Sequence, residues 1–142
     1  MKWHQYLKAS LQRWPVVGIP TLTIVDDDEL VCRSLKRIVS SSGYNVQVFT
    51  SAKAFLDSDC LNDCNCLILD VSMPGMSGLE LQRQLVIQNL HLPIIFITSQ
   101  ADECSKAQAL EAGAVDYLQK PFREEQLADA IHKAFATVRE KA

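Results

Sequence analysis

Acidic residues follow two of the short apolar runs in this sequence. Asp26, Asp27 and Asp28 come directly after the run Leu-Thr-Ile-Val, and Asp70 comes directly after Cys-Leu-Ile-Leu. Carboxylates brought close together repel and raise one another's pKa unless a cation lies between them. Because Mg²⁺ prefers carboxylate, carbonyl and water oxygens, these aspartates predict a magnesium site. One of the three consecutive aspartates could instead cap the helix that follows them.

Hydroxyl groups and a lysine follow two further apolar runs. Thr98 and Ser99 end the run Ile-Ile-Phe-Ile, and Lys120-Pro121 comes shortly after Val-Asp-Tyr-Leu. Alone, Lys120 would be read as a solvated surface lysine and Thr98 as an ordinary strand residue. Together with the aspartates, they would supply a nucleophilic oxygen, a metal and donors to phosphoryl oxygens, which are the requirements of phosphoryl transfer.

Five short apolar runs predict five β-strands. They cover residues 22–25, 46–49, 66–69, 94–98 and 115–118. Continuous runs of Ile, Leu and Val, without strict alternation with polar residues, are typical of strands covered on both faces in a parallel sheet.

Helical patterns alternate with these strands. They cover residues 30–42, 51–56, 77 to about 88, 103–112 and 124–139, with Gly43 and Gly113 in C-cap positions and a capping box at Ser77 and Glu80. The resulting (βα)5 order predicts an α/β fold, a doubly wound five-stranded parallel sheet of the flavodoxin-like kind. With the strand order 2-1-3-4-5, strands one and three are neighbours. Their aspartates would then meet at the carboxyl edge of the sheet, where such folds bind ligands.

Length and composition bound the function. The chain has 142 residues and a net charge of −3, which fits one domain over residues 21–142 and argues against broad nucleic-acid binding. No apolar run approaches the roughly 20 residues of a membrane span, and no signal-peptide core stands at the N-terminus. A cytoplasmic location is therefore expected.

Residues 1–20 fall outside the alternating pattern and form an N-terminal extension of unknown role. They contain both tryptophans, the basic residues Lys2, Lys8 and Arg13, and no acid. A basic amphipathic helix through Trp3 and Trp14 could contact a membrane surface or a partner. A loose tail, a flap on the domain and cloning-derived residues are the alternatives.

The five cysteines do not form a recognisable disulfide or zinc pattern. Cys60, Cys64 and Cys66 cluster as C-x3-C-x-C, without the paired C-x2-C spacings that are usual in structural zinc sites. Buried free thiols are the favoured interpretation, and thiol-based sensing by this cluster is an alternative.

The strand-end residues together resemble the receiver domain of two-component response regulators, over about residues 21–138. The resemblance rests on I-V-D-D-D at 24–28, L-D-V-S-M-P-G-M-S-G at 69–78, I-T-S at 97–99 and G-A-V-D-Y-L-Q-K-P-F at 113–122. The sequence is most similar to receivers of the FixJ/NarL type, which commonly continue into a helix-turn-helix DNA-binding domain. The chain is thus expected to be a stand-alone receiver or the regulatory half of a transcription factor, which would contact DNA only through an output domain absent here.

The resemblance implies a chemical role for each residue of the acidic site. Asp70 would be the phosphoacceptor, receiving a phosphoryl group from a sensor histidine kinase or a histidine phosphotransfer protein. Asp27 and Asp70 would bind Mg²⁺ directly, Ser72 through its backbone carbonyl, and Asp26 through a coordinated water. The protein would assist its own phosphorylation and dephosphorylation without being an enzyme in the usual sense.

The resemblance also implies a switch. Lys120, before a cis peptide to Pro121, would pair with the phosphoryl group; Thr98 would hydrogen-bond it, and Tyr117 would turn inward as Thr98 moves. The altered surface would comprise the last strand and the last two helices, roughly residues 101–133, where homodimerisation or partner docking is expected.

Two alternatives belong to other functional classes. A pseudo-receiver would keep the fold as a protein-interaction module without phosphorylation, but it predicts losses among the site residues, and none is lost. A phosphatase or phosphomutase with an aspartyl nucleophile would have D-x-D after the first strand, whereas here the expected nucleophile, Asp70, ends the third.

Overall fold

The computed structural model describes residues 18–100 and 102–141, with side chains as far as Ala136. The helix predicted through Trp3 and Trp14 lies outside these residues, so that hypothesis and the role of the N-terminal extension stay untested.

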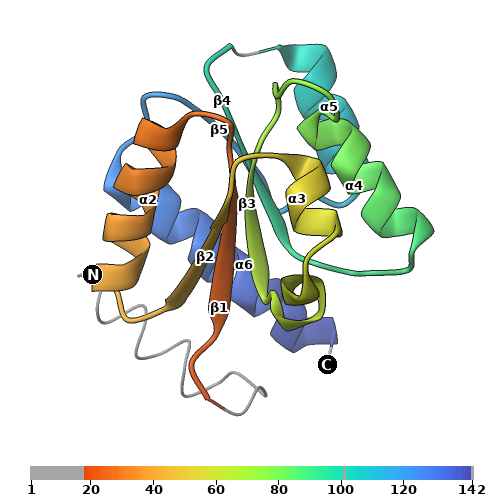
Figure 1. Cartoon of the computed structure of the whole chain (residues 1–142). Helices are drawn as coiled ribbons and strands as arrows, with labels where there is room; N and C mark the ends of the chain where they lie inside the picture. The colour runs from red at the N-terminus through yellow and green to blue at the C-terminus, as the bar shows by residue number, and fades with distance from the viewer. Residues whose placement is uncertain (1–17, 101, 142) are drawn as a thin grey trace.

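The predicted parallel sheet is confirmed. Its strands are β1 (Thr21–Val25), β2 (Asn45–Phe49), β3 (Cys66–Asp70), β4 (Ile94–Thr98) and β5 (Asp116–Gln119). All neighbouring pairs are parallel, and the order is β2-β1-β3-β4-β5 (Figure 1). β1 and β3 are therefore adjacent, which brings their carboxyl ends together at one edge of the sheet.

In the described part of the chain, five α-helices follow the strands, each starting within one residue of its predicted boundary. They are α2 (Glu29–Ser41), α3 (Ala52–Leu56), α4 (Gly78–Ile87), α5 (Glu103–Glu111) and α6 (Glu124–Lys141). A short 3-10 helix, η1 (Asp59–Asp63), was not predicted. Its five residues carry no apolar periodicity and none of them is buried, so the sequence holds no signal for it.

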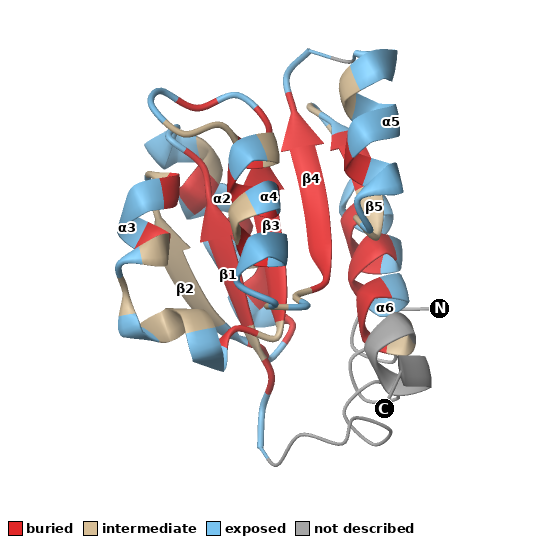
Figure 2. Cartoon of the chain, turned by 90° about the vertical axis from the view of Figure 1, so that its right-hand side faces the viewer, coloured by how far each residue is buried: buried red, intermediate tan, exposed pale blue. Residues whose placement is uncertain are grey.

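Helices cover both faces of the sheet and enclose two apolar layers (Figure 2). On one face, α2 and α6 pack their buried side chains, including Leu35 and Ile131, against Ile24 and Ile68 of the sheet. On the other face, α3, α4 and α5 enclose a second cluster. Because both faces are covered, β3 and β4 are buried along their whole length, as their continuous apolar runs predict.

Polar caps fix two helix starts beside the carboxyl edge of the sheet. The Asp28 carboxylate accepts hydrogen bonds from the backbone N–H groups of Leu30 and Val31, at 2.9 and 3.4 Å. Asp28 is thus the aspartate of the run that caps a helix. The capping box of Ser77 and Glu80 is confirmed at the start of α4. Both caps set where the loops after β1 and β3 must end.

Gly78, the first residue of α4, brings that helix into close contact with the end of β3. A Cβ atom on Gly78 would collide with the carbonyl oxygen of Asp70 and would lie 3.0 Å from its carbonyl carbon. The Gly78 N–H also donates to the Val71 carbonyl at 2.9 Å. The missing side chain therefore lets the loop of residues 71–77 close tightly over the strand end.

The cysteine cluster divides between core and surface. Cys64 and Cys66 are buried, and Cys60 on η1 is half-buried. Burial raises the pKa of the Cys64 and Cys66 thiols above their ordinary value, which disfavours the reactive thiolate. Among the described residues, no group of three or more potential metal ligands includes a cysteine.

We predict that Gly78→Ala destabilises the fold more than Gly75→Ala. The first substitution forces a backbone collision, and overpacking of this kind costs up to about 3 kcal/mol. At Gly75 an added Cβ meets nothing within 4 Å, and only the positive φ of 77° opposes it, by about 1 kcal/mol. Urea unfolding of both variants measures the difference, and equal losses would contradict the close contact at Gly78.

We further predict that only two of the five thiols react readily in the native protein. Cys104 is exposed and Cys60 is half-buried, whereas Cys32, Cys64 and Cys66 are buried. Burial raises the pKa of Cys32 to about 11 as well. Titration with a disulfide reagent at pH 8, before and after denaturation, tests this prediction. Rapid native labelling of Cys64 or Cys66 would instead favour thiol sensing by the cluster.

Candidate functional site

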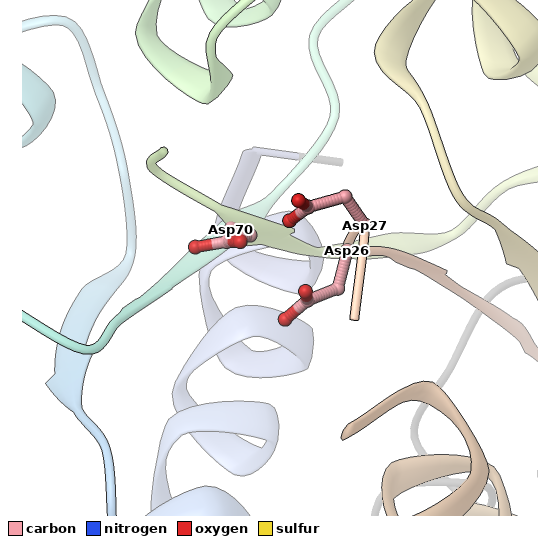
Figure 3. A group of neighbouring side chains, drawn as sticks. All are labelled: Asp26, Asp27 and Asp70. Carbon is pink, nitrogen blue, oxygen red and sulfur yellow. The ribbon is translucent and has the colours of Figure 1, made fainter. Parts of the chain in front are cut away.

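Three carboxylates meet at the carboxyl ends of β1 and β3. One side-chain oxygen each of Asp26, Asp27 and Asp70 lies within 4.8 Å of the other two. Figure 3 shows Asp26 and Asp27 extending from the end of β1 toward Asp70. Asp26 and Asp70 are buried and Asp27 is exposed. The site is therefore walled by protein on one side and open to solvent on the other.

Lys120 is the cation nearest these carboxylates among the described residues. Its Nζ atom lies 2.9 Å from Asp26 Oδ2 and 3.9 Å from Asp70 Oδ1. The other Asp26 oxygen accepts the Asp28 backbone N–H at 2.9 Å. Both oxygens of the buried Asp26 carboxylate are thus hydrogen-bonded, as a buried charge requires.

The position of Lys120 is fixed by its own backbone. Its N–H donates to the Thr98 carbonyl at 2.7 Å, which continues the pairing of β4 and β5. The peptide from Lys120 to Pro121 is cis, as the resemblance predicted. The lysine side chain is 19 % exposed and extends from the end of β5 to the carboxylates at the ends of β1 and β3.

Asp70 is the carboxylate most perturbed by these surroundings. Its burial and the neighbouring Asp26 charge raise the pKa of Asp70 to about 7, although Lys120 acts in the opposite direction. The backbone N–H of Ser72 donates weakly to Asp70 Oδ1 at 3.4 Å. At neutral pH Asp70 is therefore poised between its two protonation states, and any added cation would favour the carboxylate.

The donor set fits a hard divalent cation. Three carboxylates with one lysine leave an excess of negative charge, and Mg²⁺ takes oxygen ligands in this setting. Among the described residues the three aspartates are the one cluster of potential metal ligands of this size. Such an acidic trio is typical of the Mg²⁺ site of receiver domains. The roles of single residues as ligands, including the Ser72 carbonyl, stay predictions.

Thr98 and Tyr117 lie next to one another on β4 and β5. The buried Thr98 hydroxyl donates to the Gln100 carbonyl at 3.0 Å and accepts the Gln100 N–H at 3.2 Å. The Tyr117 ring is 9 % exposed and packs on Phe96 with ring centroids 6.2 Å apart. Its hydroxyl is buried without a hydrogen bond of standard geometry, although Thr98 is near enough to lower its pKa. Burial outweighs that effect and raises the pKa of Tyr117 overall.

The structure assembles most of the residues that the sequence singled out. Those it brings to one edge of the sheet are Asp26, Asp27, Asp70, Ser72, Thr98, Tyr117 and Lys120. Ser99 is exposed, and Asp28 caps α2 instead of joining the trio. Most side chains of the predicted site therefore lie at the predicted edge of the sheet.

Two neighbours of the site had no assigned role in the sequence. Gly78 packs against the Asp70 backbone, and its place in the string M-P-G-M-S-G was the available signal. The Cys32 thiol donates to the Asp26 carbonyl oxygen at 3.1 Å from within α2. No spacing rule links these two residues, so this contact depends on the packing of α2 alone.

No helix in the described part of the chain combines the length and apolarity that crossing a bilayer would require.

Comparisons with known proteins agree with this geometry. The family model described as response regulator receiver domain matches residues 22–132. The response regulator protein TodT of Pseudomonas putida is 49% identical over 111 residues, covering 78% of this chain and 49% of TodT. The transcriptional regulatory protein FixJ of Azorhizobium caulinodans is 40% identical over 108 residues, covering 76% of this chain and 51% of FixJ.

A solved structure of the response regulator StyR is similar throughout the fold. It superimposes with a TM-score of 0.80 at 40% identity, covering 87% of this chain and 63% of the StyR chain. The chain spans about half the length of the curated relatives it matches, and several of those relatives are named as transcriptional regulators. Matched over most of its length by the family model, with the acidic trio at the expected edge of the sheet, the chain belongs to the response regulator receiver domain family.

Proposed function

We propose that Asp70 accepts a phosphoryl group from a phosphohistidine of a sensor histidine kinase or a histidine phosphotransfer protein. An Asp70 carboxylate oxygen attacks phosphorus, the P–N bond to histidine breaks, and the histidine nitrogen keeps the bonding electrons. The observation that carries this proposal is the meeting of the Asp26, Asp27 and Asp70 oxygens within 4.8 Å, with Lys120 Nζ at 2.9 and 3.9 Å.

Mg²⁺ would be held by Asp27 and Asp70 directly, by the Ser72 carbonyl, and by Asp26 through a water. When bound, the ion neutralises charge on the transferring phosphoryl oxygens. Asp26 is already bonded to Lys120 and to the Asp28 N–H, which supports an indirect role for it. Lys120 would leave part of its contact with Asp26 to pair with a phosphoryl oxygen.

Phosphorylation would act as a switch through Thr98 and Tyr117. It adds close to two negative charges and three acceptor oxygens, and the Thr98 hydroxyl would exchange its Gln100 contacts for one of them. We infer a change on the surface formed by α5, β5 and α6, and a phosphorylation-dependent homodimer or partner complex there. Sedimentation with and without a phosphoryl mimic measures that assembly.

The wider role follows from the same proposal. Residues 21–142 would form a receiver that acts as a phosphoacceptor and not as a conventional enzyme, in the cytoplasm. Free thiols at all five cysteines suit a reducing compartment. As the regulatory part of a transcription factor, it would affect DNA binding through a separate output domain.

We expect Asp70→Asn to abolish phosphorylation by a small phosphodonor such as acetyl phosphate. The amide lacks the nucleophilic oxygen anion, so intact-mass analysis should show a single phosphoryl adduct on the wild type with Mg²⁺ and none on the variant. The wild type without Mg²⁺ should also stay unmodified.

The matched control is Asp63→Asn, because Asp63 is exposed on η1, just before the opposite end of β3. This variant should be phosphorylated like the wild type. If the folded, Mg²⁺-supplied wild type forms no adduct and does not respond to beryllofluoride, the pseudo-receiver becomes the better description.

We also expect Mg²⁺ affinity to fall as the pH drops below about 7. The raised pKa of Asp70, about 7, means that a proton must leave before this carboxyl can bind the ion. The affinity loss should approach tenfold per pH unit below that value and level off above pH 8. Calorimetry between pH 5.5 and 8.5 tests it, and an Asp70→Asn variant with the same pH profile would show that another group is responsible.

A further inference from the structure

Among the described residues, α5 is the α-helix with the fewest buried side chains. Of its residues, all of which are described, Ala109 alone is buried, and Figure 2 draws α5 largely in the colour of exposed residues. The neighbouring α4 buries four residues and begins with the close contact of Gly78 on Asp70. α4 is thus the fixed member of this pair of helices, and little apolar burial holds α5 against it.

One buried side chain of α4 binds α5 directly. Gln82 is 3 % exposed, and its Nε2 atom donates to the Ala109 carbonyl at 3.0 Å. Ala114 N–H donates to the same carbonyl at 3.0 Å. With the bond from Gly113 N–H to the Leu110 carbonyl, at 3.1 Å, this is a Schellman ending of α5. Gln82 therefore adds an interhelical bond to the carbonyl on which that ending depends.

The hydrogen bond from Gln82 favours the present position of α5 over shifted ones. A buried amide donor without an acceptor is unfavourable. If α5 moved, the Ala109 carbonyl would move with it, and the Gln82 amide would have no acceptor until it found another. Apolar contacts alone would favour one position of α5 over a nearby one much less, because apolar burial is not directional.

The two ends of α5 connect to different parts of the site. Its start follows the Thr98–Gln100 turn, in which the Thr98 hydroxyl bonds both backbone groups of Gln100. Its end is held by Gln82, one helical turn after Gly78 on the same helix. A change in the hydrogen bonds of Thr98 would thus affect the start of α5, while the hydrogen bond from Gln82 would oppose movement of its end.

We propose that Gln82 is a positioning residue that holds α5 in its unphosphorylated placement and so sets how much phosphorylation is needed to move it. This inference rests on the proposed function, since it concerns the response to the group on Asp70. Removing the Gln82 donor would favour the alternative placement even without a phosphoryl group, as expected for a two-state element.

The experiment compares Gln82→Leu and Gln82→Glu with the matched control Gln84→Leu, which makes the same change at a half-buried position of the same helix. Hydrogen exchange is followed at the amides of α5 and at those of the residues that end it, Ala112, Gly113 and Ala114, with increasing beryllofluoride. Loss of one hydrogen bond should speed α5 exchange about two- to tenfold without beryllofluoride. The half-effective beryllofluoride concentration should fall by a similar factor, with Gln84→Leu unchanged. Gln82→Glu should act more strongly, because its carboxylate repels the Ala109 carbonyl.

Three outcomes would overturn the proposal. Unchanged α5 exchange in both Gln82 variants would show that the bond does not position the helix. Faster exchange spread equally over the sheet would mean general destabilisation. Faster α5 exchange with an unaltered half-effective beryllofluoride concentration would leave Gln82 with a structural role alone. A failure of the proposed function looks different, because then beryllofluoride has no effect on α5 in any variant, the wild type included.

Discussion

The mutual repulsion of three neighbouring carboxylates is the constraint on which this domain's chemistry depends. The parallel pairing of β1 with β3 holds the buried Asp26 and Asp70 close together, with the exposed Asp27 beside them. Lys120 offsets part of this repulsion, but burial and Asp26 still raise the pKa of Asp70. A divalent cation at this trio would offset the remaining repulsion. On the proposed function, ion binding and activation of Asp70 as a nucleophile would both require the proton to leave Asp70.

The remaining architecture keeps that repulsion from being relieved by movement. Asp28 caps α2, which fixes the chain after β1, and Gly78 seats α4 directly on the Asp70 backbone. β3, which carries Asp70, and its neighbour β4 are buried along their whole length, and this packing makes them a rigid support for the site. Loops bind ligands well when a packed scaffold positions them, and here the apolar layers on both faces of the sheet provide it.

The sequence predicted those features that short-range patterns encode. Continuous apolar runs gave the strands, with β4 correct at both ends, and strand order then brought Asp26 and Asp70 together. β5 lies one residue later than predicted, because Val115 continues the apolar run although pairing starts at Asp116. The bond from Gln82 to Ala109 and the thiol contact of Cys32 could not be predicted. Each contact depends on how helices pack against their neighbours, and neither a glutamine nor a cysteine in a sequence indicates which residue it will contact.

The two hydroxyls beside the site show why a small chemical change can have a larger structural effect. Tyr117 buries its hydroxyl without a hydrogen bond of standard geometry, although Thr98 lies close enough to interact with it. The adjacent Thr98 hydroxyl is hydrogen-bonded to both backbone groups of Gln100 in the turn. If Thr98 donates to a phosphoryl oxygen as proposed, the turn loses the hydrogen bond from the Thr98 hydroxyl to the Gln100 carbonyl, which would weaken the link to the chain leading into α5. Because Thr98 contacts the turn at Gln100 and lies beside Tyr117, a new partner for its hydroxyl would alter the surroundings of both.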